Sequence, residues 1–158
     1  MPSDLWSFTL DFYARPGVEQ ACLTLQADGA NVCMLLCGVW LDLRGVACSP
    51  ERLREVIGLA EPWHDDVVRP LREVRTGWKQ AAQHNIALAR LRERVKALEL
   101  DAERQLLIDL ETLALKWAVT DGNGDREWLS ALAGSAGSAN SGALQVLRAA
   151  AGQAEPGA

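Results

Sequence analysis

The stretch that decides the fold runs from Asn85 to Val119 and reads NIALARLRERVKALELDAERQLLIDLETLALKWAV. It contains neither glycine nor proline, and apolar side chains recur in it every three or four residues. They are Leu88, Leu91, Val95, Leu98, Ala102, Leu106, Leu110, Leu113 and Trp117. This spacing puts them on one face of an α-helix. The stretch therefore predicts a helix of 35 residues. At ~1.5 Å per residue it would be about 52 Å long, and its apolar face needs an antiparallel neighbour or a dimer partner.

The residues before this stretch carry helical signals as well. Apolar repeats flanked by capping and stop residues predict helices within residues 3–15, 16–29, 31–44, 49–60 and 61–78. Residues 31–44 are apolar nearly all round and should form the buried central helix. Pro62 should restart the chain, and Pro70 should kink the helix that contains it because its nitrogen cannot donate a hydrogen bond. We predict an all-α, single-domain bundle of about six helices.

The C-terminal part has a different composition. A short amphipathic helix is expected around Trp128, Leu129 and Leu132. Residues 133–142 read AGSAGSANSG, which is the composition of a flexible linker. We therefore expect a helical domain at residues 1–132 and an Ala/Gly/Ser-rich flexible tail at residues 133–158.

Composition and charge limit the class of protein. The chain has 158 residues, 49% of them hydrophobic, six Trp, and a net charge of −5 from 16 Lys+Arg and 21 Asp+Glu. These values exclude a disordered chain and argue against general coating of DNA or membranes. The longest apolar run, residues 32–41, would span ~15 Å as a helix, about half a bilayer core. With no secretory signal at the N-terminus, we expect a cytoplasmic protein with reduced cysteines and no membrane contact.

The charge is segregated along the chain. Residues 1–66 carry a net charge of −6, residues 69–96 of +6, and residues 99–128 of −5. Arg72, Arg75 and Lys79 share one face of a predicted helix, beside Trp78. One interpretation is a surface for an acidic protein, or for the phosphates of a nucleic acid. The other is a basic hairpin packed against acidic helices, or a solvated face. The candidate partner-binding residues are Trp63, Arg69, Arg72, Arg75, Trp78, Lys79, Arg90 and Arg94.

Two patterns resemble metal sites without completing one. Cys33 and Cys37 are four residues apart on one helix, but zinc needs two further ligands and none stands at a known spacing. Residues 121–127 imitate the start of a calcium loop. Arg126 replaces the turn glycine of such a loop, and Leu132 replaces its bidentate glutamate. We predict no metal and no cofactor, with buried structural thiols.

Catalytic motifs are absent from the sequence. Asp42 lies in the most apolar helix, and Asp11 lies among Phe8, Phe12 and Tyr13. Each could be a buried general base, or an acid paired with an arginine. We therefore expect a non-enzymatic interaction or regulatory protein that binds another protein through the basic region. The alternatives are a nucleic-acid-binding protein that uses the same residues, or a small-ligand or enzymatic pocket around Asp42 or Asp11. A homodimer is also open.

Four separated strings resemble an uncharacterised family of small helical proteins from Pseudomonas and related proteobacteria, a domain of unknown function. They are LWSFTLDFYARPGVEQACLTLQ, ANVCMLLCGVWL, PWHDDVVRPLREVR and RERVKALELDAERQLL. The resemblance covers about residues 4–117. It implies a bacterial origin and an all-helical fold, and it assigns no catalytic residue.

Overall fold

The computed structural model describes residues 4–117 and 127–153, and these residues are helical almost throughout. In chain order they form α1 (Leu5–Tyr13), α2 (Val18–Ala27), α3 (Val32–Leu43), α4 (Pro50–Trp63), the π-helical turn η1 (His64–Val68), α5 (Arg69–Gly77), α6 (Lys79–Ala82), α7 (Ile86–Ala114), α8 (Trp128–Ala139) and α9 (Ser141–Gln153). The described part of the chain contains no strand. The predicted all-α class is confirmed, with more helices than the six expected.

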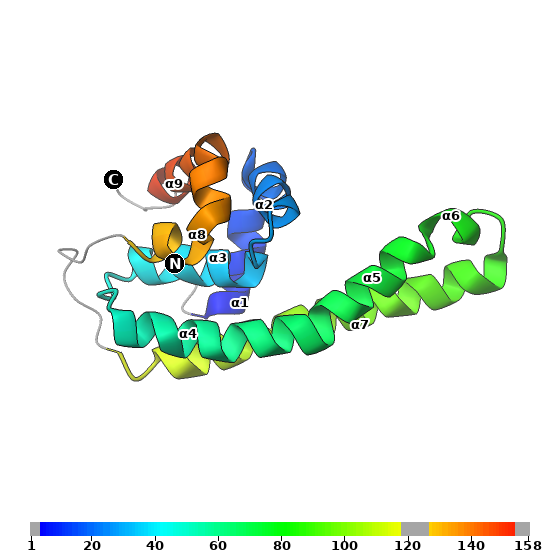
Figure 1. Ribbon diagram of the computed structural model, residues 1–158, viewed down its shortest axis with the longest axis horizontal. Coiled ribbons are helices and arrows are strands. Elements are labelled where there is room, and N and C mark those ends of the chain that lie inside the picture. Colours follow the sequence, from blue (N-terminus) through cyan, green and yellow to red (C-terminus); the bar gives the residue numbers. More distant parts are fainter. Residues whose placement is uncertain (1–3, 118–126, 154–158) are drawn as a thin grey trace.

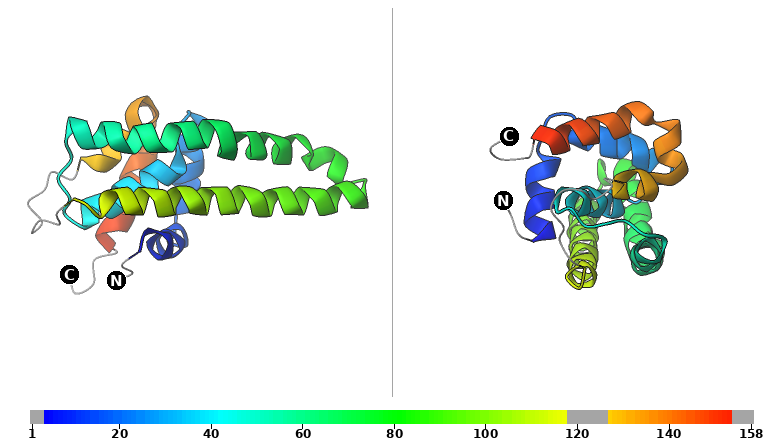
Figure 2. Two further views of the ribbon diagram at one scale, coloured as in Figure 1. Left: turned by 90° about the horizontal axis from the view of Figure 1, so that it is seen from below. Right: turned by 90° about the vertical axis from the view of Figure 1, so that its left-hand side faces the viewer.

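The molecule has two parts, a helical body and a projecting arm (Figure 1). The body consists of α1, α2, α3, α8 and α9 together with α4 and the C-terminal half of α7. The arm comprises residues 69–98, in which α5, α6 and the start of α7 extend away from the body. Figure 2 shows α4 and α5 running beside α7 along the whole length. The neighbour that the long helix requires is therefore supplied by the same chain.

The helix α3 lies at the centre of the body. Its residues Cys33–Leu41 are all buried, as its nearly continuous apolar sequence predicts. Asn31 caps it, with the side-chain oxygen accepting a hydrogen bond from the Met34 N–H at 3.3 Å. A Cβ at Gly38 would lie 3.1 Å from Leu132 Cδ1 and 3.4 Å from the Leu129 backbone. The small residue at position 38 therefore lets α8 pack closely on α3.

The two C-terminal helices belong to the core. Leu132, Ala133, Ala136, Leu144, Leu147 and Ala150 are all buried, and α9 packs against α2. The prediction of a flexible tail from residue 133 is therefore wrong for residues 133–153, while residues 154–158 lie outside the described residues. The Ala- and Gly-rich composition here serves close helix packing, because small side chains allow backbones to approach one another.

The core role of α9 gives a direct test. Leu147 is fully buried, so Leu147→Ala should lower the free energy of unfolding by about 3 kcal/mol through lost burial and a cavity. The exposed neighbour Gln145 provides the control, since Gln145→Ala should change it by less than about 0.5 kcal/mol. Urea denaturation followed by circular dichroism measures both. Equal stabilities for the two variants would contradict a packed α9.

The helices α4 and α5 are joined without the expected break. Pro62 lies inside α4, and the π-helical turn η1 lies between it and Pro70. A π-turn adds one residue to a helical turn and commonly accompanies a local bend. The turn η1, between Pro62 and Pro70, accommodates the N–H groups that these prolines lack without ending the helix. The restart of the chain predicted at Pro62 therefore does not occur.

The long helix α7 has 29 residues instead of the predicted 35. It begins where expected, with the Asn85 side chain accepting a hydrogen bond from the Leu88 N–H at 3.1 Å. It ends at Ala114, and residues 118 and 119 lie outside the described residues. None of the helices described combines the length and the apolar composition needed to cross a membrane.

Candidate functional site

The arm has no core of its own. Between Val68 and Glu99 not one residue is buried. The inner seam, where α5 and α6 meet α7, is formed by half-buried residues: Leu71, Arg72, Arg75, Trp78, Ala82, Leu88, Ala89, Arg92 and Val95. The two sides of the arm therefore cover only each other's inner faces, and their outer faces are open to solvent.

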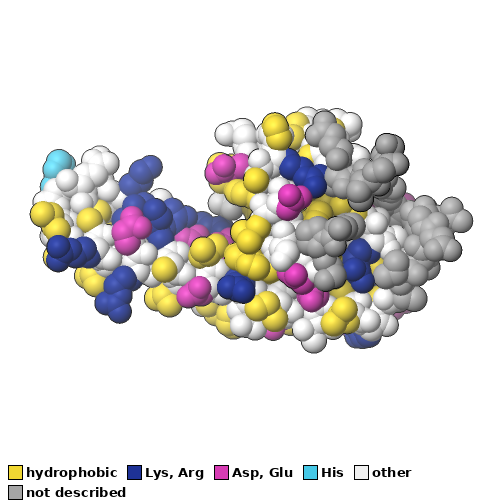
Figure 3. Space-filling model, turned by 180° about the vertical axis from the view of Figure 1, so that it is seen from behind, with side chains coloured by type: hydrophobic (Ala, Val, Ile, Leu, Met, Phe, Trp, Pro, Cys, Tyr) yellow, Lys and Arg dark blue, Asp and Glu magenta, His cyan; other side chains and the backbone are white. Residues whose placement is uncertain are grey.

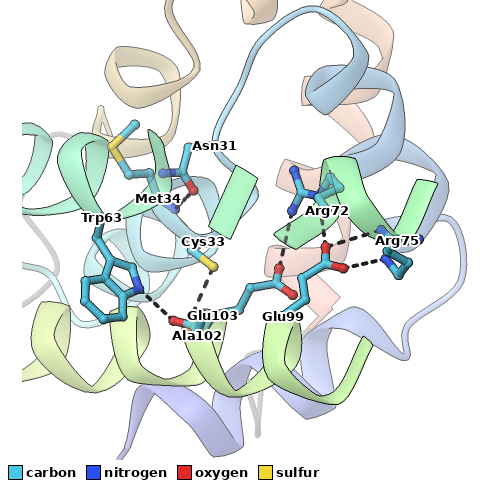
Figure 4. A network of polar contacts seen from close by, with 9 residues as sticks. All are labelled: Asn31, Cys33, Met34, Trp63, Arg72, Arg75, Glu99, Ala102 and Glu103. Atoms are coloured by element: carbon cyan, nitrogen blue, oxygen red, sulfur yellow. Dashed lines mark hydrogen bonds and ion pairs between the residues drawn. The ribbon is translucent and has the colours of Figure 1, made fainter. Parts of the chain in front are cut away.

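A cluster of ion pairs holds the base of the arm together (Figure 4). Glu99, the first buried residue of α7 after the arm, is only 6% exposed. Arg72 Nε lies 3.0 Å from Glu99 Oε2 and Arg75 Nη2 lies 3.2 Å from the same oxygen, while Arg75 Nε donates to Glu99 Oε1. Burial acts to raise the pKa of Glu99, but the hydrogen bonds from Arg75 and Arg72 outweigh it and lower that pKa. We call Arg72, Arg75 and Glu99 the clamp.

Several predicted partner-binding residues bond within the chain. Arg72 and Arg75 form the clamp on the inner side of α5. Trp63 is half-buried, and its Nε1–H donates to the carbonyl of Ala102 at 2.9 Å. Arg69 pairs with Asp65, and Trp78 lies half-buried in the seam. For Trp63, Arg72, Arg75 and Trp78, a basic hairpin packed within the fold describes the structure better than a free cationic patch. Arg69 is 50% exposed and forms a surface ion pair.

The other three predicted residues are exposed. Lys79 lies in α6, and Arg90 and Arg94 lie on the outer side of α7. In the described part of the chain none of the three forms an ion pair. Their charges are therefore available to a partner.

Sequence reasoning missed the apolar residues beside these cations. Leu91 is 48% exposed and Leu98 is 54% exposed, although both belong to the helical repeat expected to be covered. Residues 91, 94 and 98 follow helical spacing and lie on one flank of α7, with Arg90 one turn from Arg94. We call Arg90, Leu91, Arg94 and Leu98 the arm stripe. Basic and hydrophobic side chains lie side by side along the arm in Figure 3. The exposure of Leu91 and Leu98 depends on the direction from which α5 approaches, which the sequence does not encode locally.

The two carboxylates considered for an enzymatic pocket make structural contacts. Asp42 caps α8 from a distant part of the sequence, with Oδ1 3.1 Å from the Trp128 nitrogen and Oδ2 3.2 Å from the Leu129 nitrogen. Asp11 is on the surface and lies 2.7 Å from Arg15 Nη2. Asp11 is thus an acid paired with an arginine, and Asp42 stabilises a helix N-terminus.

Three of the four cysteines lie in the core, and Cys48 is half-buried. Cys22, Cys33 and Cys37 are buried and unbridged. Burial raises the pKa of the Cys37 thiol to about 12 and that of Cys33 higher still, so both remain protonated at neutral pH. Within residues 4–117 and 127–153, no three His, Cys, Asp or Glu side chains are grouped to hold a metal ion. The calcium-like loop falls largely on residues 118–126, outside the described residues.

Comparison with known proteins gives one match. The family described as "Protein of unknown function (DUF2390)" matches residues 4–110, which confirms the resemblance to a domain of unknown function. No curated protein and no solved structure matches the chain.

Proposed function

The chain belongs to the DUF2390 family, whose description assigns no activity. From the geometry of the arm, we propose that the arm binds another protein that presents an acidic and apolar surface. The single observation that supports this most is the arm stripe. Leu91 and Leu98 are about half exposed on a projecting element that buries no residue of its own.

The spacing of the stripe suits a helical partner. Leu91 and Leu98 are seven residues apart, which is the repeat that packs against another helix at a shallow crossing angle. A two-helix arm becomes a three- or four-helix bundle when a partner contributes the missing helices. Such a partner would cover Leu91 and Leu98 and remove their apolar surface from water.

Charge gives the partner its expected chemistry. Along α7, Arg90 precedes Leu91, and Arg94 lies between Leu91 and Leu98. Arginine at such a position forms bidentate hydrogen bonds with carboxylates and is frequent among residues that dominate binding energy. A partner that presents Asp or Glu around an apolar strip matches this surface in charge and in polarity.

The test compares single charge reversals on the arm and on the body. The full-length tagged chain is used to recover partners from its native host, and the dissociation constant is then measured with the purified partner. Arg94→Glu should weaken binding at least about tenfold, because it removes a cation and repels the acidic partner. Arg72 and Arg75 are unsuitable for this test because they form the clamp.

The matched control is Arg54→Glu, an exposed cation on α4 in the body, which should change the dissociation constant by less than about twofold. Circular dichroism should show equal helicity for both variants. Equal binding by Arg94→Glu and the unchanged chain would contradict the proposal. Recovery of nucleic acid instead of protein would also contradict it, as would a homodimer that Arg94→Glu dissociates.

A further inference from the structure

A cavity of about 380 Å³ lies at the base of the arm, where α1 crosses α7, and is separate from the arm stripe. Its walls come from α1, α2, α3 and α7, and Figure 3 shows hydrophobic side chains gathered where the arm joins the body. The volume falls within the ~300–1,000 Å³ range of pockets that hold small organic molecules.

The walls of the cavity are mainly apolar. Trp6, Leu10, Leu36, Leu100 and Leu107 line it. Leu10 is 55% exposed and Leu100 is 53% exposed, although the two come from different helices and meet at one opening. Large apolar side chains exposed together at a concave site are typical of a surface that an apolar ligand covers.

The cavity also contains an incompletely paired carboxylate. Glu103 lines it, and its nearest charged partner is Arg72 Nη2, at 3.6 Å from Oε2. Figure 4 shows Arg72 between the two carboxylates: its Nε donates to Glu99, and its Nη2 forms the longer ion pair with Glu103, at a distance beyond that of a hydrogen bond. Burial raises the pKa of Glu103, and Arg72 offsets only part of that effect. The Glu103 side chain is 26% exposed, and a partly buried carboxylate gains from a cation or a hydrogen-bond donor placed against it.

A second polar group in the wall lacks a partner. Thr9 is only 8% exposed, and its hydroxyl makes no hydrogen bond in the described structure. The remaining polar wall includes Tyr13, Glu19 and Gln26, and none of the lining residues that the structure describes is Lys, Arg or His. Ionisable acids without lining cations make the site suited to a ligand of positive charge.

From these observations we infer that the cavity is a binding site for a small organic cation, an amine attached to an apolar or aromatic body. The apolar body fills the space between Trp6, Leu36 and Leu107, and the ammonium group donates to the Glu103 carboxylate. Trp6 lines the cavity, so an aromatic ring of the ligand can pack against an aromatic wall.

The experiment uses three probes that share one ring system and differ in charge: tryptamine, the neutral alcohol tryptophol, and the anionic indole-3-acetate. Titration calorimetry with the full chain measures each dissociation constant. Tryptamine should bind with a constant on the order of 0.1–1 mM. Tryptamine should bind at least about tenfold more tightly than tryptophol, because a hydrogen bond between charged groups contributes more binding free energy than a neutral one. Indole-3-acetate should bind more weakly than tryptophol, because its carboxylate is repelled by Glu103.

Two variants test the assignment of the carboxylate. Glu103→Gln should weaken tryptamine binding about tenfold and leave tryptophol binding unchanged. Asp101→Asn, an exposed acid on the same helix, is the matched control and should leave both unchanged. Leu10→Lys at the exposed rim provides a second variant that does not touch the core, and it should weaken tryptamine binding selectively. Equal affinity for the three probes, no binding at millimolar concentration, or unchanged selectivity in Glu103→Gln would each overturn the inference.

Discussion

Trp128→Ala is expected to lower the free energy of unfolding by about 4 kcal/mol, one of the two largest effects of a single substitution anticipated in this fold. The side chain is completely buried. Its ring stacks on Trp117 with centroids 5.6 Å apart, and its Nε1–H donates to the carbonyl of Val46 at 2.8 Å. Alanine removes the buried ring, the aromatic contact and the hydrogen bond together, and leaves the Val46 carbonyl without a donor.

Urea denaturation measures this effect. Leu115→Ala is the control, because Leu115 is 65% exposed and should contribute less than about 0.5 kcal/mol. Trp128→Phe retains an aromatic ring but removes the indole N–H, so it should fall between the two and remain folded if Trp128→Ala does not. A loss below about 1 kcal/mol in Trp128→Ala would show that α8 is not part of the core.

The N-terminal half of the fold could be predicted because its signals are local. Asn31, Ser49 and Asn85 each cap the helix that follows, as their positions before apolar repeats indicate. The apolar sequence of α3 likewise predicts a helix buried on every side. Such features depend on residues within one or two helical turns, so sequence reasoning identifies them. The first helix is capped by Asp4, within the range of residues 3–15 in which a helix is predicted.

The packing of α8 and α9 could not be predicted because their contacts are distant in sequence. Asp42 caps α8 from 86 residues away. The buried positions of α8 and α9 are often alanine, so they give little hydrophobic signal. Their stability comes from close packing against α2 and α3, and a composition-based interpretation cannot distinguish such helices from a linker.

The candidate site shows the same limit at the level of single residues. The basic block at residues 69–96 is a property of the sequence itself, but the sequence does not show which of its cations are paired. Arg75 and Arg94 belong to the same block, yet one is used in the clamp and the other points to solvent. The difference arises because Glu99 of α7 lies opposite Arg75 of α5. These two residues are 24 positions apart in the sequence, so their contact is not a local feature.

Glu99→Ala is the second substitution with a large expected effect, and it tests whether the clamp holds the arm to the body. The carboxylate accepts hydrogen bonds from two guanidiniums that are only 20% and 28% exposed. Its removal leaves Arg75 without its counter-charge and Arg72 with the more distant Glu103 carboxylate, 3.6 Å away, which should lower the free energy of unfolding by about 3 kcal/mol. Hydrogen exchange should rise in α5 and in the arm portion of α7, while α3 remains protected.

The pH dependence of stability separates the charge of Glu99 from its packing. Its pKa lies below the ordinary value of 4.5, so its contribution is fully present at neutral pH and is lost as pH falls through that lowered pKa. Glu99→Gln keeps the shape without the charge. The stability difference between Glu99→Gln and the unchanged chain should therefore be largest near pH 7 and shrink below about pH 4. A difference that does not change with pH would contradict an electrostatic clamp.

Replacing the whole clamp with apolar residues tests whether the loss in Glu99→Ala comes from unpaired charges. Glu99→Leu combined with Arg72→Met and Arg75→Leu removes all three charges of the clamp. The charge left near it is that of Glu103, whose side chain is 26% exposed, so much of the stability lost in Glu99→Ala should return. Glu93→Ala is the control, because its carboxylate is 68% exposed and lies 3.6 Å from Lys96. It should change stability by less than about 0.5 kcal/mol. If the triple variant stays as unstable as Glu99→Ala, then the clamp residues act through specific hydrogen bonds that apolar packing at the base of the arm cannot replace.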